Sequence, residues 1–374
     1  MAAAALCVLD GAMTGRRRRV IHCGTGTIGE HGLRSVIGHP DLELVGLLAH
    51  TPDKLGRDAG ELVGLPPVGV QATDDLAGLL ALDVDALGYF APTMGREDEA
   101  VQQISAFLER GVNVSTLVLS GLVDPSSVNP SVVTTVERAA ERGQASFFTT
   151  GIEPGFITTQ FPITMLSICS NIESVLTTEY FNYGNYPDRR FIFDVMGFGK
   201  PADYVGAMFV PGGPVSYDTL WGAAVLWLTR QLGAEPERLQ LQRDVWVTNE
   251  DFEMAAGVVP AGTVGAIRFQ IQAIVDGAPL VVAEHVNFGH ESAAPQWDRP
   301  QLGDNGVYRV IVRGKPDFDV QMVFDGRHAG ALGGRLACAN HVVNAIPAVC
   351  AARPGILSVV DLAPYTGRVA TRGR

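Results

Sequence analysis

The sequence predicts an α/β protein in which a doubly wound parallel sheet is followed by a second, α+β domain with a mixed or antiparallel sheet. Short apolar segments alternate with helical periodicities up to residue 150, which is typical of a parallel sheet covered by helices. A glycine-rich turn follows the first of these segments at Gly24. Beyond Gly155 longer β-like segments take over, and 374 residues exceed what one hydrophobic core usually organises.

The first lobe is divided into elements by its glycine and proline residues. The segment Arg19 to Cys23 is apolar and bounded by glycine, as a buried parallel strand would be, and the helix after it stops before Gly38-His39-Pro40. Strands are predicted over 19–23, 42–48, 84–90, 112–119 and 145–150, and helices over 28–37, 97–110 and 131–142.

The second lobe is predicted to combine helices with a meander of strands, and a closing helical run is expected to pack back on the first lobe. The helices are expected over 161–169, 217–232 and 332–351, and the strands over 175–183, 239–247, 265–275, 280–288 and 307–312. The domains that follow are a disordered tail (1–17), a doubly wound α/β domain (18–155, with 331–374) and an α+β domain (156–330).

Charge and cysteine spacing exclude several classes of function. A net charge of −12 and a pI near 5.1 would repel a polyanion, so nucleic acid is not expected as a partner. The five cysteines show no CxxC and no metal-like spacing, so no metal is expected and a reducing compartment is favoured. Residues 2–9 are apolar but too short for a signal peptide or a membrane span. We expect a cytoplasmic protein with no membrane partner.

The turn Gly24-Thr25-Gly26-Thr27-Ile28-Gly29 lies directly after a strand and opens a helix, as a dinucleotide site requires. Gly24 permits the tight turn, Gly26 lets the backbone approach a pyrophosphate, and Gly29 allows the helix to pack closely on the strand. The helix N-terminus faces the anion. The pattern indicates a Rossmann domain that binds a nicotinamide dinucleotide through all six residues.

The end of the second strand decides between NAD and NADP, because an acid there would bind the ribose 2′-hydroxyl. The chain has His50, Thr51 and Lys54 at this place, which suit a 2′-phosphate and favour NADP. The alternative is a polar turn with Asp53 reaching the ribose, which leaves NAD open. Loop residues after later strands are expected over the ribose and nicotinamide, namely Ala91, Pro92, Thr93, Leu119 and Ser120.

Several short motifs resemble known oxidoreductase families. The segment 55–62 is similar to the N-terminal domain of dihydrodipicolinate reductases, and this likeness covers most of residues 18–155. The segments 151–156, 344–347 and 353–356 resemble the 2,4-diaminopentanoate dehydrogenases and the native amine dehydrogenases. The resemblance implies a Rossmann lobe and an α+β lobe that shapes the substrate site and a dimer interface. It also implies a cofactor-binding role for Asn344.

The chain departs from both families at positions that matter for chemistry. Dihydrodipicolinate reductases carry a paired-histidine and lysine motif, whereas this chain has His285 within Ala283 to Asn287, with no adjacent histidine and no lysine close behind. A role in lysine biosynthesis is therefore not expected. By the resemblance, the position of Glu153 is usually an asparagine in amine dehydrogenases, so a carboxylate here replaces an amide.

Glu153 and His285 are the predicted catalytic residues. Glu153 follows the last Rossmann strand, whose C-terminal edge borders the nicotinamide, and its carboxylate suits an ammonium ion or a general base that activates ammonia and water. Its alternative role is that of a helix-start residue favoured by the helix dipole. His285 either orients and protonates the substrate or is structural. Glu97 and Glu99 are alternative carboxylates, although the acidic first turn of a helix explains them more simply.

An aromatic cluster in the second lobe has two interpretations. Aromatic side chains supply rigid area that could wall an apolar substrate pocket, or they form ordinary core. The cluster consists of Tyr180, Phe181, Tyr183, Tyr186, Phe191 and Phe193.

These features together predict an NAD(P)-dependent dehydrogenase that acts on a C–N centre as a homodimer. It would oxidise an amine to a ketone or aldehyde and ammonia, or run the reverse reaction. Two alternatives remain open. One is another NADPH-dependent imine or carbonyl reductase related to the dihydrodipicolinate reductases, and the other is a nucleotide-binding sensor without catalysis.

Overall fold

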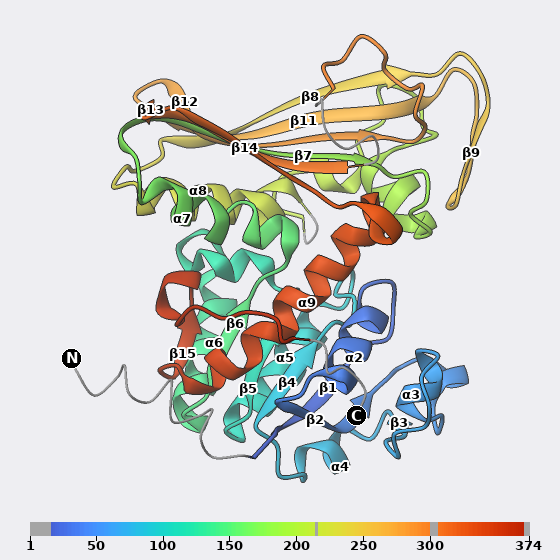
Figure 1. The fold of residues 1–374 in the computed structure, drawn as a ribbon, viewed down its shortest axis with the longest axis vertical. Coiled ribbons are helices and arrows are strands. Elements are labelled where there is room, and N and C mark those ends of the chain that lie inside the picture. The colour runs from blue at the N-terminus through green and yellow to red at the C-terminus, as the bar shows by residue number, and fades with distance from the viewer. Residues whose placement is uncertain (1–15, 214–215, 300–305, 370–374) are drawn as a thin grey trace. The chain divides into compact units, whose positions relative to one another are not determined.

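The structure is a computed structural model that describes residues 16–213, 216–299 and 306–369 (Figure 1). The expected disordered tail over 1–17 lies outside the described residues except for its last two positions. The chain divides into two compact units. One unit contains the residues up to Gly151 together with those from Leu336 onwards, and the other runs from Ile152 to Arg335.

The first unit contains the predicted Rossmann sheet. Its described strands are all parallel and follow the order β15-β6-β5-β4-β1-β2-β3. The order reverses between β1 and β4, which is where ligands bind in such sheets. The strands are β1 (Arg18–Cys23), β2 (Leu42–Leu48), β3 (Ala72–Thr73), β4 (Ala86–Tyr89), β5 (Asn113–Thr116), β6 (Ser146–Thr149) and β15 (Gly355–Leu357).

Helices cover both faces of this sheet. The side chains of β1 alternate, so Val20 packs with residues of α2 and α9, whereas Ile21 packs with residues of α5 and α6. A hydrophobic core therefore lies on each face of the sheet at β1. The helices of the unit are α2 (Gly29–Gly38), α3 (Ala59–Leu62), α4 (Leu76–Leu80), α5 (Glu97–Glu109) and α6 (Pro130–Gly143).

The closing segment of the chain completes the first unit. The helix predicted over 332–351 is present as α9 (Gly330–Ala351), and the Ser115 hydroxyl of β5 donates a hydrogen bond to its Val342 carbonyl at 2.7 Å. The segment after Pro354, which was not predicted as a strand, forms β15 and pairs with β6. None of the helices in the described ranges is long and apolar enough to cross a membrane.

The second unit contains the predicted mixed sheet. In its described part the order is β14-β13-β7-β12-β11-β8, and β7 and β12 are parallel while the other neighbours are antiparallel. The strands are β7 (Ser170–Asn182), β8 (Arg238–Val247), β11 (Val264–Val275), β12 (Ala278–Phe288), β13 (Gly306–Lys315) and β14 (Phe318–Val323), with a small hairpin of β9 (Phe252–Met254) and β10 (Gly257–Val259).

The described part of this unit includes the helices α7 (Gln160–Leu166) and α8 (Ala223–Gln231), and a helical turn over Asp218–Gly222 leads into α8. Strand β12 alternates, so His285 faces Trp221 of that turn while its neighbour Glu284 lies on the opposite face of the sheet. The two faces of β12 therefore carry two separate polar networks.

Candidate active site

The glycine turn of the first unit has the geometry of a dinucleotide site. Gly24 has φ +93°, and a Cβ there would lie 2.5 Å from the Ala91 nitrogen. A Cβ at Gly29 would lie 2.4 Å from the Gly24 oxygen. A Cβ at Gly26, in contrast, would meet no atom within 4 Å. Gly24 and Gly29 are thus required by the fold, whereas the open space at Gly26 fits the close approach of a pyrophosphate.

Two rings hold the turn in place. His22 is buried, its Nε2 lies 2.7 Å from the Gly24 oxygen, and its ring stacks on Phe90 with centroids 4.9 Å apart. Burial lowers the pKa of His22 to about 4, so the ring is neutral at pH 7. A Cβ on Gly32 would lie 2.7 Å from Phe90, which shows how closely helix α2 packs. The sequence predicts His22 only as a member of the first strand, without a role at the turn.

Lys54 lies at the glycine turn, where its ammonium donates to the Thr25 carbonyl at 2.8 Å and to the Thr25 hydroxyl at 2.9 Å. Thr51 is exposed and precedes the short turn that carries Lys54. His50 is half-buried, and its Nε2 has no hydrogen-bond partner among the described residues. Burial, and then the charge of Arg96, lower the pKa of His50.

The alternative carboxylates at the start of α5 serve local structure. Arg96 donates to both oxygens of Glu99, at 2.8 and 2.6 Å, and Glu97 accepts a hydrogen bond from the Gly95 backbone at 2.8 Å. This arrangement agrees with the interpretation of both acids as the first turn of a helix.

The remaining predicted cofactor residues occupy loops and one helix. Ala91 lies against Gly24, and the Thr93 carbonyl accepts a hydrogen bond from the Arg96 nitrogen at 2.6 Å. Leu119 has a left-handed backbone with φ +55° and precedes a short helical turn that begins at Ser120. The other members are Pro92 after β4, Thr27 and Ile28 in the glycine turn, and Asn344, which lies on α9 beside Gly367.

The second unit places Glu153 and His285 together. Glu153 lies in an irregular turn, and its side chain is 2% exposed. Its carboxylate accepts a hydrogen bond from the Thr158 hydroxyl, with the two oxygens 2.6 and 2.5 Å from Thr158 Oγ1. Nε2 of His285 is 3.7 Å from Glu153 Oε1. Burial raises the pKa of Glu153, although the histidine and Thr158 oppose this effect.

His285 belongs to one row of side chains that crosses the sheet. Its register partners are Glu179 on β7 and Phe269 on β11, and Glu179 in turn is opposite Tyr308 on β13. The imidazole stacks on Phe269 with ring centroids 4.6 Å apart and an angle of 3° between the ring planes. It makes an edge contact with Trp221, with ring centroids 4.7 Å apart. Burial lowers the pKa of His285, but the neighbouring carboxylates of Glu153 and Glu179 outweigh burial and raise the pKa to about 9.

Glu179 is the site residue that sequence reasoning missed. Its carboxylate is 3.4 Å from His285 Nδ1 and accepts hydrogen bonds from Tyr183 at 2.9 Å, Tyr308 at 3.1 Å and Asn287 at 3.4 Å. Burial raises the pKa of Glu179, but these donors prevail and the net shift is downward. The one sequence feature that could have indicated Glu179 is its carboxylate in the middle of the strand predicted over 175–183. The aromatic residues of that strand were interpreted as pocket wall or core, without the acid.

The three ionisable groups form one buried cluster. One imidazolium lies between two carboxylates, all nearly inaccessible to solvent. In the described part of the chain, His285 Nε2 and Trp221 Nε1 have no hydrogen-bond partner. Buried polar atoms are nearly always satisfied. These two N–H groups are therefore available to an acceptor atom of a small polar ligand, whereas the Glu153 carboxylate is the group that can accept a hydrogen bond from an amine or iminium.

The predicted aromatic cluster divides between different surroundings. Tyr183, Tyr186 and Phe191 contact one another, and Tyr183 also binds Glu179. Tyr180 instead packs on Phe288. The other two pack elsewhere, Phe181 on Tyr308 and Phe193 beneath the Arg189 guanidinium.

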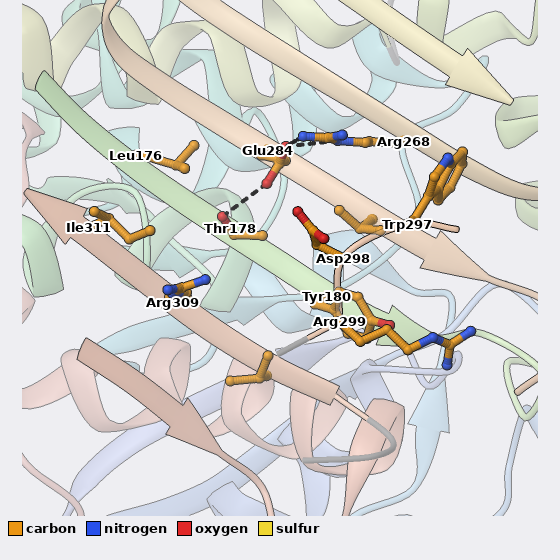
Figure 2. Close-up of a pocket in the computed structure, with 12 residues that line it drawn as sticks. Leu176, Thr178, Tyr180, Arg268, Glu284, Trp297, Asp298, Arg299, Arg309 and Ile311 are labelled. Atoms are coloured by element: carbon orange, nitrogen blue, oxygen red, sulfur yellow. Dashed lines mark hydrogen bonds and ion pairs between the residues drawn. The ribbon is translucent and has the colours of Figure 1, made fainter. Parts of the chain in front are cut away.

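The opposite face of the sheet carries a separate cavity of about 150 Å³ (Figure 2). There Glu284 accepts hydrogen bonds from Arg268 at 3.0 and 2.8 Å, and its other oxygen lies 3.3 Å from the Thr178 hydroxyl. Figure 2 shows Glu284 directed toward Arg268 and Thr178. This carboxylate, adjacent to His285 in sequence, is thus engaged in a different network.

Comparison with known proteins identifies relatives among the amine-acting dehydrogenases that the sequence motifs resemble. Residues 221–370 match the family described as the 2,4-diaminopentanoate dehydrogenase C-terminal domain. The amine dehydrogenase of Streptomyces virginiae is 34% identical over 352 residues, which cover 92% of this chain and 97% of that protein. A stretch of 63 residues is 40% identical to the 4-hydroxy-tetrahydrodipicolinate reductase of Synechococcus elongatus and covers 17% of this chain and 23% of that protein.

The fold is also similar to a solved structure. The amine dehydrogenase of Mycobacterium smegmatis superposes with a TM-score of 0.75 at 19% identity, covering 94% of this chain and 97% of that one. The Rossmann unit and these matches define an oxidoreductase that uses a nicotinamide nucleotide. The chain belongs to the amine dehydrogenase family. The resemblance to amine-acting dehydrogenases stated from the sequence is confirmed.

Proposed function

We propose that this protein interconverts a small amine with the corresponding ketone or aldehyde and ammonia, and that Glu153 is its acid–base group. The observation that carries the proposal is the buried contact of Glu153 with His285, 3.7 Å apart, beside donors that are available to a ligand. A carboxylate in such a place can accept and return protons, because burial brings its pKa toward the working pH.

The proposed oxidation consumes an ammonium-bearing carbon, the oxidised nucleotide and one water, and it yields the carbonyl, ammonium, the reduced nucleotide and one proton. Glu153 first takes a proton from the substrate ammonium to give the free amine. After it releases this proton to solvent, it takes a proton from the water that attacks the iminium carbon and passes that proton to the nitrogen. The carbon–nitrogen bond then breaks, and the hydroxyl proton of the intermediate leaves with the nitrogen as ammonium. His285 stabilises the ionised form of Glu153 between these steps.

The glycine turn is the proposed holder of the cofactor, with the pyrophosphate at Gly26 and the adenosine end at His50, Thr51 and Lys54. When bound, the nicotinamide supplies or accepts the hydride. We assign NADP as the preferred nucleotide, because the Lys54 ammonium is fixed at the turn and can meet a 2′-phosphate. The loop residues and Asn344 complete the proposed site: Ala91, Pro92, Thr93, Leu119 and Ser120.

The charge of the acid–base site restricts the substrate. Two carboxylates and one imidazolium favour a cationic amine or iminium over a dianionic ring, since an unpaired like charge in a buried site is costly. The family resemblance adds the proposed organisation: a dinucleotide domain (18–155, with 331–374) and a substrate domain (156–330) that also forms a homodimer, in a cytoplasmic enzyme. Light scattering of the purified protein tests the dimer.

The test of the function pairs two substrates in one assay that follows NADPH absorbance. A small ketone or aldehyde is expected to be turned over only when ammonium is present, and the cyclic dihydrodipicolinate intermediate is expected to be reduced little. Efficient turnover of the dicarboxylate would favour the reductase alternative. Absence of turnover with every amine and ketone, despite nucleotide binding, would favour the sensor.

A further inference from the structure

We infer that Glu179 is a positioning residue, which anchors His285 through Nδ1 so that Nε2 faces Glu153 and keeps that carboxylate ionised. The inference rests on the proposed function and assigns a role to a residue outside the predicted site. It concerns the row of side chains that crosses the sheet from β13 to β11.

The contacts of Glu179 leave it little capacity to bind a substrate. One oxygen receives the Tyr183 hydroxyl, the His285 ring and the Asn287 amide, and the other receives the Tyr308 hydroxyl. A carboxylate offers about four acceptor positions, so this one is nearly saturated. A saturated, buried carboxylate is a fixed negative charge and is poorly suited to exchange protons during turnover.

The surroundings of His285 favour its protonated form. Phe269 stacks on one face of the ring, an arrangement that stabilises a cation through the aromatic quadrupole. Nδ1 is directed at Glu179, which leaves Nε2 as the ring atom that faces Glu153. The titratable groups beside the ring are Glu179 and Glu153, and the hydroxyls of Tyr183 and Tyr308 bind Glu179. The ring neighbours from β11 and from the 218–222 turn, Phe269 and Trp221, do not titrate.

Removal of the Glu179 charge should therefore act through His285. In Glu179→Gln the imidazole loses one of its two carboxylate partners, its pKa falls, and Glu153 loses the positive charge that keeps it ionised. We expect kcat for amine oxidation at pH 7 to fall by about 10- to 100-fold. The acid limb of the kcat/KM profile should move upward by about one pH unit, with the nucleotide Kd unchanged.

Two variants control the experiment. Glu179→Asp keeps the charge and should retain the wild-type pH profile at a reduced rate. Glu284→Gln removes a carboxylate next to His285 in sequence but on the opposite face of the sheet, where Arg268 and Thr178 engage it. It should leave both rate and profile unchanged. An unshifted acid limb in a folded, active Glu179→Gln would overturn the inference and leave the proposed function standing.

A second measurement needs no variant and no turnover. Nitrogen-15 NMR of the wild-type histidines should show one ring that stays protonated at both nitrogens at pH 8, assigned to His285 by its absence in His285→Gln. A neutral ring at pH 7 would overturn the inference. Failure of the wild-type protein to act on amines, with His285 protonated, would instead count against the proposed function.

Discussion

Burial and charge have opposite effects on the pKa of Glu153: removal from solvent raises the pKa, and the facing imidazolium of His285 lowers it. In Glu153→Gln the shape and the Thr158 contact are preserved and the exchangeable proton is lost. We expect turnover to fall by about two to four powers of ten, the usual range for an acid–base group, with melting temperature and cofactor affinity retained.

The matched control for this prediction is Glu97→Gln, because Glu97 was the alternative carboxylate and is bound to the Gly95 backbone. It should retain wild-type activity. Equal activity in wild type and Glu153→Gln, with loss in Glu97→Gln, would move the acid–base role to the start of α5.

His285 makes the stability of the protein depend on pH. Its pKa is about 9 in the folded chain, against an ordinary value of 6.5. A group whose pKa is raised by folding stabilises fully below the unfolded pKa, and this contribution is lost as the pH rises through the folded pKa. The free energy of unfolding, measured with urea, should therefore fall between pH 6.5 and 9.5, by about 3 kcal/mol at most.

The decline should be much smaller in His285→Gln. His22 and His341, whose pKa values burial lowers to about 4, titrate well below this window and do not obscure it. A decline of the same size in the variant would show that another group causes it.

At the scale of elements, different glycines of the glycine turn are expected to serve the fold and the ligand. A side chain at Gly26 meets no protein atom, so Gly26→Val should keep the wild-type melting temperature and weaken binding of either nucleotide by more than about 100-fold. Gly29→Ala, which places a Cβ 2.4 Å from the Gly24 oxygen, should instead destabilise the fold by about 1–3 kcal/mol. Normal nucleotide binding by Gly26→Val would contradict the assignment of the turn.

The segment after β2 is expected to choose the nucleotide. Lys54→Ala should weaken NADPH binding by about 10-fold and change NADH binding by less than about 2-fold, since only NADPH carries the extra phosphate. Arg57→Ala removes an exposed cation from the same segment and serves as the control. Preference of the wild type for NADH, unchanged in Lys54→Ala, would refute the assignment.

Element prediction from the sequence succeeded where periodicity was long. Strands β11 and β12 and helix α9 were predicted within two residues of their observed bounds, because each presents many residues of one period. Strands β3 and β15 span two and three residues and were not predicted. Segments this short carry no period, and their strand character comes from the neighbouring strands.

At the scale of the whole molecule, Glu153 and His285 could be chosen as candidates from the sequence, but their proximity in space could not be predicted from it. His285 meets Glu179, 106 residues earlier, because β12 lies parallel to β7 in a register that places them opposite each other. A parallel pairing of this kind depends on the complete sheet, which local patterns do not determine. The third member of the site therefore emerged only from the fold.

The measurement that tests the central claim most directly follows one atom of deuterium. The enzyme is supplied with NADPH deuterated at the transferable C4 position, a small ketone and excess ammonium, and the products are analysed by mass spectrometry. If the protein catalyses reductive amination, the product is an amine one mass unit heavier than the amine formed with unlabelled NADPH. The deuterium lies on the carbon that bears nitrogen, and no product forms when ammonium is omitted. Deuterium in an alcohol formed equally well without ammonium would contradict the central claim.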